Sequence, residues 1–112
     1  MDPMTRARAS QLFDALSHPT RLRMVELLCT GERSVGEIVE TLELGQSGTS
    51  QHLGILTRAG VLTVEPVGTT RIYRVRGPRI GRILSLIEEF CAVHELYGFV
   101  GENDKSNSEI TA

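Results

Sequence analysis

The chain has 112 residues, a length typical of one domain with one core. Apolar residues make up 40%, charged residues 23% and aromatic residues only 4%, so we expect a globular fold with an aliphatic core. No apolar run approaches the roughly 20 residues that span a bilayer, and the first residues lack the apolar stretch of a secretory signal. Two cysteines are too few for a disulfide scaffold. We therefore expect a cytoplasmic protein with reduced thiols and no membrane contact.

Charge is unevenly distributed along the chain, whose net charge is −2. Residues 1–82 hold 11 arginines and 8 acidic residues, a net charge of +3, whereas residues 83–112 hold one lysine and 6 acidic residues, a net charge of −5. A basic segment is typical of nucleic-acid-binding proteins, but ordinary solvated surfaces give similar counts. Charge alone therefore leaves the function open.

Apolar residues at helical spacing predict helices over most of the first half of the chain. The expected ranges are residues 4–16, 19–30, 34–42 and 46–59. Pro19 is tolerated in the first turn of the second helix, and Ser34 with Glu37 has the form of a capping box that begins the third. Gly60 is placed to end the fourth helix as a C-cap.

The fourth predicted helix has a polar face of an unusual kind. Leu53 and Leu56 form its apolar side, whereas the other side is uncharged and made of short side chains, as at Ser47, Ser50 and Gln51. A helix face that meets only solvent is normally rich in Glu and Lys. The composition of this face therefore favours contact with a partner.

A hairpin and a long helix are expected next. The predicted strands are residues 62–67 and 70–75, joined across Gly68 and Thr69, with Pro66 on a sheet edge. Residues 78–98 carry an apolar residue at every third or fourth position and predict the last helix. Residues 101–112 are polar, and we expect a disordered tail.

Two short helices joined by a tight turn and followed by a hairpin are typical of a winged helix-turn-helix, so the predicted fold is mostly α with a small β-hairpin. In such modules the second helix enters the major groove of double-stranded DNA, and the hairpin, or wing, lies near the backbone or minor groove. We predict that Arg74 and Arg76 extend a basic strip along the wing. The predicted DNA-binding residues are Gln46, Ser47, Thr49, Ser50, Gln51 and His52 in the helix and Thr69, Thr70 and Arg71 in the wing.

Four blocks in order along about residues 8–97 carry a family resemblance. They are residues 17–28, 34–38, 46–62 and 68–73. In these blocks the chain resembles the ArsR/SmtB family of bacterial transcriptional repressors. The resemblance implies a homodimeric winged helix-turn-helix domain, here residues 4–98, that binds operator DNA and is released by a small inducer. It also implies dimerisation through the first and last helices, and the apolar stripe supports an interface that includes Ile80, Leu84, Ile87 and Cys91.

The inducer is less well defined by the sequence. The metal-ligand patterns usual in that family are absent from the third and last predicted helices. Cys91 and His94 lie on one helix face and are a possible site for a thiophilic metal or metalloid, although Cys91 also fits an apolar core position. Some family members that sense oxidising or sulfide-derived species carry one cysteine on each of two helices. Cys29 and Cys91 resemble that pair, with Cys29 about one turn away from the matching position, so a thiol switch and two core cysteines both stay open.

Three classes of function remain, in descending order of support. The first is a sequence-specific DNA-binding repressor. The second is a winged-helix module that binds proteins and not DNA, or a regulator without a thiol or metal inducer. An enzyme ranks last, because the phosphate-binding, zinc-protease and C-x-x-C motifs are absent.

Overall fold

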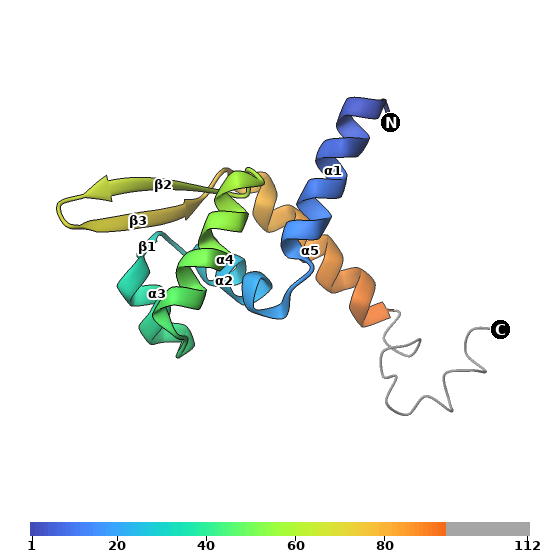
Figure 1. The fold of residues 1–112 in the computed structure, drawn as a ribbon. Helices are drawn as coiled ribbons and strands as arrows, with labels where there is room; N and C mark the ends of the chain where they lie inside the picture. The colour runs from blue at the N-terminus through green and yellow to red at the C-terminus, as the bar shows by residue number, and fades with distance from the viewer. Residues whose placement is uncertain (94–112) are drawn as a thin grey trace. The chain divides into compact units, whose positions relative to one another are not determined.

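A computed structural model of the protein describes residues 1–93 (Figure 1). The described elements are α1 (Pro3–Leu16), α2 (Pro19–Cys29), β1 (Arg33–Ser34), α3 (Val35–Leu42), α4 (Gln46–Arg58), β2 (Leu62–Val67), β3 (Thr70–Val75) and α5 (Pro78–Val93). These helices and the hairpin confirm the predicted fold class, and the order α3, α4, hairpin is that of a winged helix-turn-helix.

The chain divides into two compact units, of which the first is Met1–Ile80 and the second begins at Gly81. The first unit contains every element up to β3, and most of α5 lies in the second. The predicted domain over residues 4–98 spans both units and stays a prediction. The predicted tail, residues 101–112, lies outside the described residues.

Local chemistry explains where the helices begin. The Asp2 carboxylate accepts a hydrogen bond from the Thr5 amide at 2.8 Å and caps α1, which starts one residue earlier than predicted. At α3, the Ser34 hydroxyl accepts from the Glu37 amide at 3.1 Å while the Glu37 carboxylate accepts from the Ser34 amide at 2.8 Å. These reciprocal bonds form the predicted capping box.

The sheet has three antiparallel strands in the order β1-β3-β2 among the residues described. The hairpin has the predicted bounds, and Val67 pairs with Thr70 across a two-residue turn. Gly68 has a φ of +63° at the first turn position, where a type II′ turn needs a glycine. Pro66 lies on edge strand β2, as expected. Strand β1 was not predicted, and it pairs Arg33 with Tyr73 on β3.

The core of the first unit lies where α2, α3 and α4 meet the start of β2. Its fully buried side chains are Met24, Val25, Leu28, Ile38, Thr49, Leu53, Leu56, Val61 and Leu62. The core is aliphatic as expected, with Tyr73 as its buried aromatic residue. Among residues 1–93, no helix is long and apolar enough to cross a membrane.

Candidate nucleic-acid interface

Helix α4 is anchored by one face and exposes the other. Leu53 and Leu56 are fully buried against the core, whereas the first three residues and the opposite face are open to solvent. Gly45 at the N-cap provides no side-chain hydrogen bond, so the first amides of α4 have no side-chain cap. The exposed predicted residues of this helix are Gln46, Ser47, Ser50 and Gln51. These side chains form one uncharged polar surface, which we call the α4 polar face.

Thr49 does not belong to the α4 polar face, and its prediction as a DNA contact is wrong. Its side chain is only 1% exposed, and its hydroxyl donates to the Gly45 carbonyl oxygen at 2.6 Å. Thr49 precedes Leu53 by four residues and Leu56 by seven, so helical geometry places all three on the buried side. Its role is to pack the first turn of α4 against the core.

His52 lies at the border between the buried and exposed sides of α4. The ring is half-buried, and its Nδ1 atom is 3.2 Å from Nη1 of Arg21 on α2. Its centroid is 4.5 Å from that of His18. Burial lowers the pKa of His52, and the nearby His18 and Arg21 lower it further. Sequence reasoning did not identify the contact with Arg21, which joins residues far apart in the chain.

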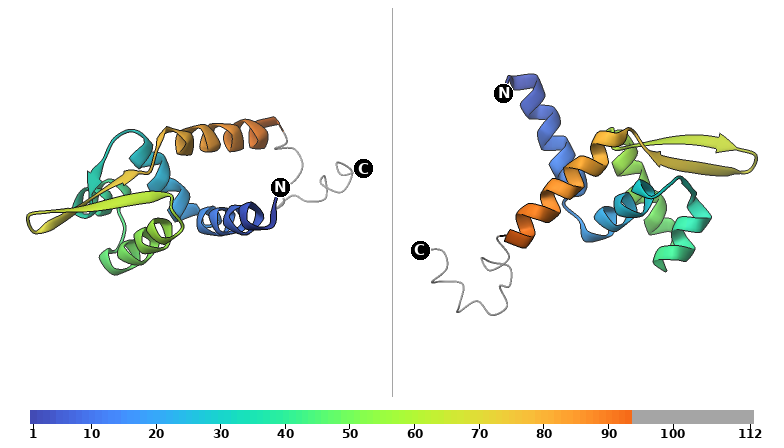
Figure 2. Two further views of the ribbon diagram at one scale, coloured as in Figure 1. Left: turned by 90° about the horizontal axis from the view of Figure 1, so that it is seen from above. Right: turned by 180° about the vertical axis from the view of Figure 1, so that it is seen from behind.

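The wing is the β2–β3 hairpin, and its tip projects beyond the helices of the first unit (Figures 1 and 2). Thr69 and Arg71 are exposed there and Thr70 is half-buried. Arg71 pairs with Pro66 on the neighbouring strand, one residue from the turn. The structure therefore places a cation near the end of a protruding hairpin, as the sequence predicted.

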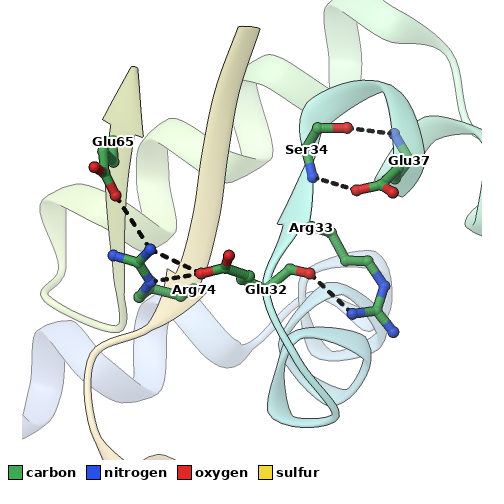
Figure 3. Close-up of polar contacts among 6 residues, drawn as sticks. All are labelled: Glu32, Arg33, Ser34, Glu37, Glu65 and Arg74. Carbon is green, nitrogen blue, oxygen red and sulfur yellow. Dashed lines mark hydrogen bonds and ion pairs between the residues drawn. The ribbon is translucent and has the colours of Figure 1, made fainter. Parts of the chain in front are cut away.

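Arg74 does not extend the basic strip of the wing. Its Nε and Nη2 atoms donate to Oε1 of Glu32 at 3.0 and 2.7 Å, and Nη2 also donates to Glu65 at 3.1 Å (Figure 3). These two carboxylates raise the pKa of Arg74, chiefly through the hydrogen bonds from Glu32. The trio carries a net charge of −1, so the prediction that Arg74 adds to a basic strip is wrong. Arg76 is exposed.

Both cysteines are exposed free thiols. The core position that the sequence left open for Cys29 is wrong, because the thiol is exposed and the buried residues of α2 are Met24, Val25 and Leu28. Cys29 lies about 40° around the helix from the buried Val25, but it is the last residue of α2 and its side chain stays exposed there. Partial burial of the sulfur raises the pKa of Cys29, and the nearby Glu26 raises it further. Raising this pKa lowers the fraction of reactive thiolate at neutral pH.

The predicted metal ligands are only partly covered by the structure. Cys91 is exposed near the end of the described part of α5, and His94 lies outside the described residues. Within residues 1–93, no three His, Cys, Asp or Glu side chains are grouped so that they could hold a metal ion. The suggested Cys91–His94 site therefore stays a prediction.

Helix α5 exposes much of its apolar surface. Leu86 and Phe90 are each 61% exposed and Val93 is 68% exposed, and no described residue of the helix is fully buried. Of the predicted interface residues, Ile80, Leu84 and Ile87 are half-buried and Cys91 is exposed. Exposed apolar surface of this kind is typical of a protein interface.

Comparison with known families identifies the fold and the class of protein. A family model described as "Bacterial regulatory protein, arsR family" matches residues 18–64. The HTH-type transcriptional regulator Rv0081 of Mycobacterium tuberculosis, itself uncharacterised, is 37% identical over 92 residues, which are 81% of this chain and 80% of the relative. The biofilm growth-associated repressor of Agrobacterium fabrum is 34% identical over 97 residues, 83% of each chain. The transcriptional activator HlyU of Vibrio cholerae is 33% identical over 90 residues, 80% of this chain and 83% of the relative.

Solved structures give the same result. The crystal structure of Rv0081 has a TM-score of 0.72 at 36% identity and covers 82% of this chain and 92% of the other. The solution structure of the homodimeric winged helix-turn-helix DNA-binding domain Mb0332 from Mycobacterium bovis has a TM-score of 0.75 at 25% identity, with 81% and 84% coverage. The sequence matches and the shared fold agree. The chain therefore belongs to the ArsR family of bacterial regulatory proteins and is a winged helix-turn-helix transcriptional regulator.

Proposed function

We propose that the protein is a homodimeric repressor that binds operator DNA through α4 and the wing. The observation that carries this proposal is the α4 polar face, which is exposed, uncharged and built on a helix whose other face is buried. Ser and Gln side chains reach base edges without the bulk or repulsion of acidic residues. The first amides of α4 have no side-chain cap, which favours a phosphate near that end of the helix.

Two kinds of contact are expected from this surface. Gln51 is our candidate for base readout, because a glutamine amide pairs with an adenine edge through two hydrogen bonds. Gln46, Ser47 and Ser50 contact the groove and the phosphates beside it. In the wing, Arg71 contacts a phosphate or the minor groove, with Thr69 and Thr70 next to it. His52 is half-buried, so it contributes less directly.

A homodimer fits both the apolar surface of α5 and the needs of an operator. A second copy would cover Leu86, Phe90 and Val93, together with the predicted interface at Ile80, Leu84, Ile87 and Cys91. The related Mb0332 domain is itself described as homodimeric. Two recognition helices about 34 Å apart would read half-sites one helical turn apart. Because the protein works on DNA, we place it in the cytoplasm.

For the inducer, we propose a thiol-reactive species or a thiophilic metal that acts on Cys29 and Cys91. Both thiols are exposed and so accessible to small reagents. The raised pKa of Cys29 opposes fast oxidation and favours the second candidate, a regulator without a thiol inducer. Relatives include both a repressor and an activator, so the direction of regulation also needs a test.

The proposal is tested by binding to the DNA upstream of the protein's own gene. We expect a salt-dependent mobility shift, and Gln51→Ala should cost roughly 1–3 kcal/mol on that operator and little on random DNA. Equal losses on both DNAs would show that Gln51 only positions the protein. A module that binds only proteins would show no shift at low salt.

The inducer is tested on the same complex with peroxide, polysulfide and arsenite. The expected result is release of wild type and retention of the Cys29→Ser, Cys91→Ser double variant. If the double variant is released equally, the thiols are not the sensor. If wild type stays bound with all reagents, the regulator without a thiol inducer is favoured.

A further inference from the structure

One side chain, Arg21 on α2, connects three helices of the first unit. Its Nε atom donates to the Ala15 carbonyl oxygen at 2.6 Å and Nη2 to the Asp14 carbonyl oxygen at 3.4 Å, both in the last turn of α1. Its Nη1 atom is 3.2 Å from Nδ1 of His52 on α4. We call this set of contacts the Arg21 link. It joins the end of the first helix to the helix that carries the polar face.

The contacts with α1 have a clear physical basis. The last carbonyls of an α-helix have no partner within the helix and carry a partial negative charge. Arg21 supplies donors and a positive charge to this end, while the Ser17 hydroxyl also donates to the Asp14 carbonyl oxygen at 2.6 Å. Arg21 is half-buried, so its bond to the Ala15 carbonyl oxygen is less screened than one made by an exposed arginine.

The contact with His52 depends on the protonation state of the imidazole. A guanidinium only donates hydrogen bonds, so Nδ1 of His52 must accept and its proton must be on Nε2. The other ring beside it, His18, accepts at Nδ1 from the Thr20 amide at 3.2 Å. A proton on Nδ1 of His52 would place two cations against each other and remove the acceptor.

We propose that Arg21 is a positioning residue that holds the recognition helix α4 at a fixed place relative to α1, and that it does so only while His52 is neutral. This inference rests on the proposed function, in which α4 enters the major groove. Arg21 itself need not touch DNA. Its effect is to align the α4 polar face with the helix that, by family resemblance, takes part in dimerisation.

The surroundings of His52 support this dependence. The ring faces Arg21 of α2 and His18 at the N-cap of α2, and from α1 the groups around Arg21 are the backbone carbonyls of Asp14 and Ala15. The two titratable or charged neighbours that act on His52 therefore both favour its neutral form. Among residues 1–93 no acidic side chain contributes to this shift, so a proton on His52 would meet two basic neighbours and no compensating carboxylate.

The first test uses variants that change the link and leave the α4 polar face intact. His52→Asn places an amide oxygen near the position of Nδ1, so it keeps an acceptor that cannot titrate. Arg21→Lys keeps the charge but has a single nitrogen, which cannot serve all three acceptors at once. We expect Arg21→Lys to weaken operator binding on the order of tenfold at pH 7.5, with little change on random DNA.

The pH profile separates this role from a general structural one. The ratio of operator to random-DNA affinity should fall for wild type as the pH is lowered below about 6.5, and it should stay flat for His52→Asn. Protonated histidines add positive charge and strengthen binding to any DNA, and this effect cancels in the ratio of the two affinities. Identical profiles for the two proteins would overturn the proposal. If Arg21→Lys does not fold, the comparison of wild type with His52→Asn still decides.

A measurement without DNA keeps this inference distinct from the proposed function. Nitrogen-15 NMR of the imidazole should show the Nε2-protonated form of His52 at pH 7.5, and Arg21→Gln should shift its titration upward. An Nδ1-protonated ring, or an unchanged titration in Arg21→Gln, would refute the link even if DNA binds. Failure of wild type to bind the operator at any pH would refute the proposed function, whatever the NMR result.

Discussion

Arg71 and Arg74 are both exposed on strand β3, but only Arg71 should act as a DNA contact. They are three residues apart and so lie on opposite faces of the strand. Arg74 is bound to Glu32 and Glu65, whereas Arg71 lies near the wing tip. Each phosphate contact adds about 0.9 to the slope of log affinity against log salt concentration, so Arg71→Gln should lower the slope by about 1.8 in a dimer with two wings. Raising the salt concentration from 50 to 200 mM should therefore weaken DNA binding by wild type roughly 12-fold more than binding by Arg71→Gln.

The matched control removes Arg74 at constant net charge. In the Arg74→Gln, Glu65→Gln double variant one positive and one negative charge disappear together, so long-range repulsion from DNA is unchanged. We expect its salt slope, measured by fluorescence anisotropy on operator DNA, to equal that of wild type. If the double variant loses as much slope as Arg71→Gln, Arg74 is a phosphate contact and the reasoning from the ion pairs is refuted. An unchanged slope for Arg71→Gln would show that the wing tip does not touch the backbone.

Four further predictions follow from the described residues. Thr49→Val removes the hydroxyl bond to Gly45 and should lower the free energy of unfolding by about 0.5–1.5 kcal/mol in denaturant titration while operator affinity stays the same; a loss of affinity without a loss of stability would return Thr49 to the interface. Gly54→Ala should raise that free energy by about 0.5–1 kcal/mol, because the new Cβ meets only the flexible end of Arg58 at 3.3 Å, and a lower melting temperature would contradict this. Ile87→Glu should give a monomer in sedimentation, since it places a charge in the apolar surface, and a persistent dimer would move the interface elsewhere. The Ser34 amide and hydroxyl lower the pKa of Glu37, so the ionised carboxylate contributes its full stabilisation above about pH 4.5 and this contribution is lost as the pH falls. In Glu37→Gln the free energy of unfolding should therefore depend less on pH in the acid range, and an unchanged pH dependence would show that the cap does not couple folding to the protonation of Glu37.

The parts of the fold that depend on local chemistry could be predicted from the sequence. The capping box of Ser34 and Glu37, the glycine turn at Gly68 and the edge proline Pro66 each act over a few residues, and each lies where expected. Strand β1 could not be predicted in this way. It has only two residues and exists because it pairs with β3, some forty positions later in the chain.

The wrong predictions for Thr49 and Arg74 differ in how far the sequence alone could have corrected them. Thr49 shares the spacing of the buried Leu53 and Leu56, so strict helical periodicity would have placed it inside. In the same way, the hairpin register puts Glu65 diagonal to Arg74 and predicts part of that ion cluster. Glu32, in contrast, reaches Arg74 only through the pairing of β1 with β3.

Dimerisation has a particular importance for a regulator with this charge distribution. With Arg74 paired to two carboxylates and the α4 polar face uncharged, these two parts of the proposed interface add no net positive charge, so neither of them adds to the salt-dependent attraction to random sequence. In the proposed homodimer, operator affinity would depend on two half-site contacts made together, since the second would occur at the high effective concentration that the dimer imposes. A change that alters the distance between two recognition helices removes this gain without touching any base contact. A coupling of about 1–3 kcal/mol is enough for such control, which is why a link as small as Arg21 and His52 matters to a protein of this design.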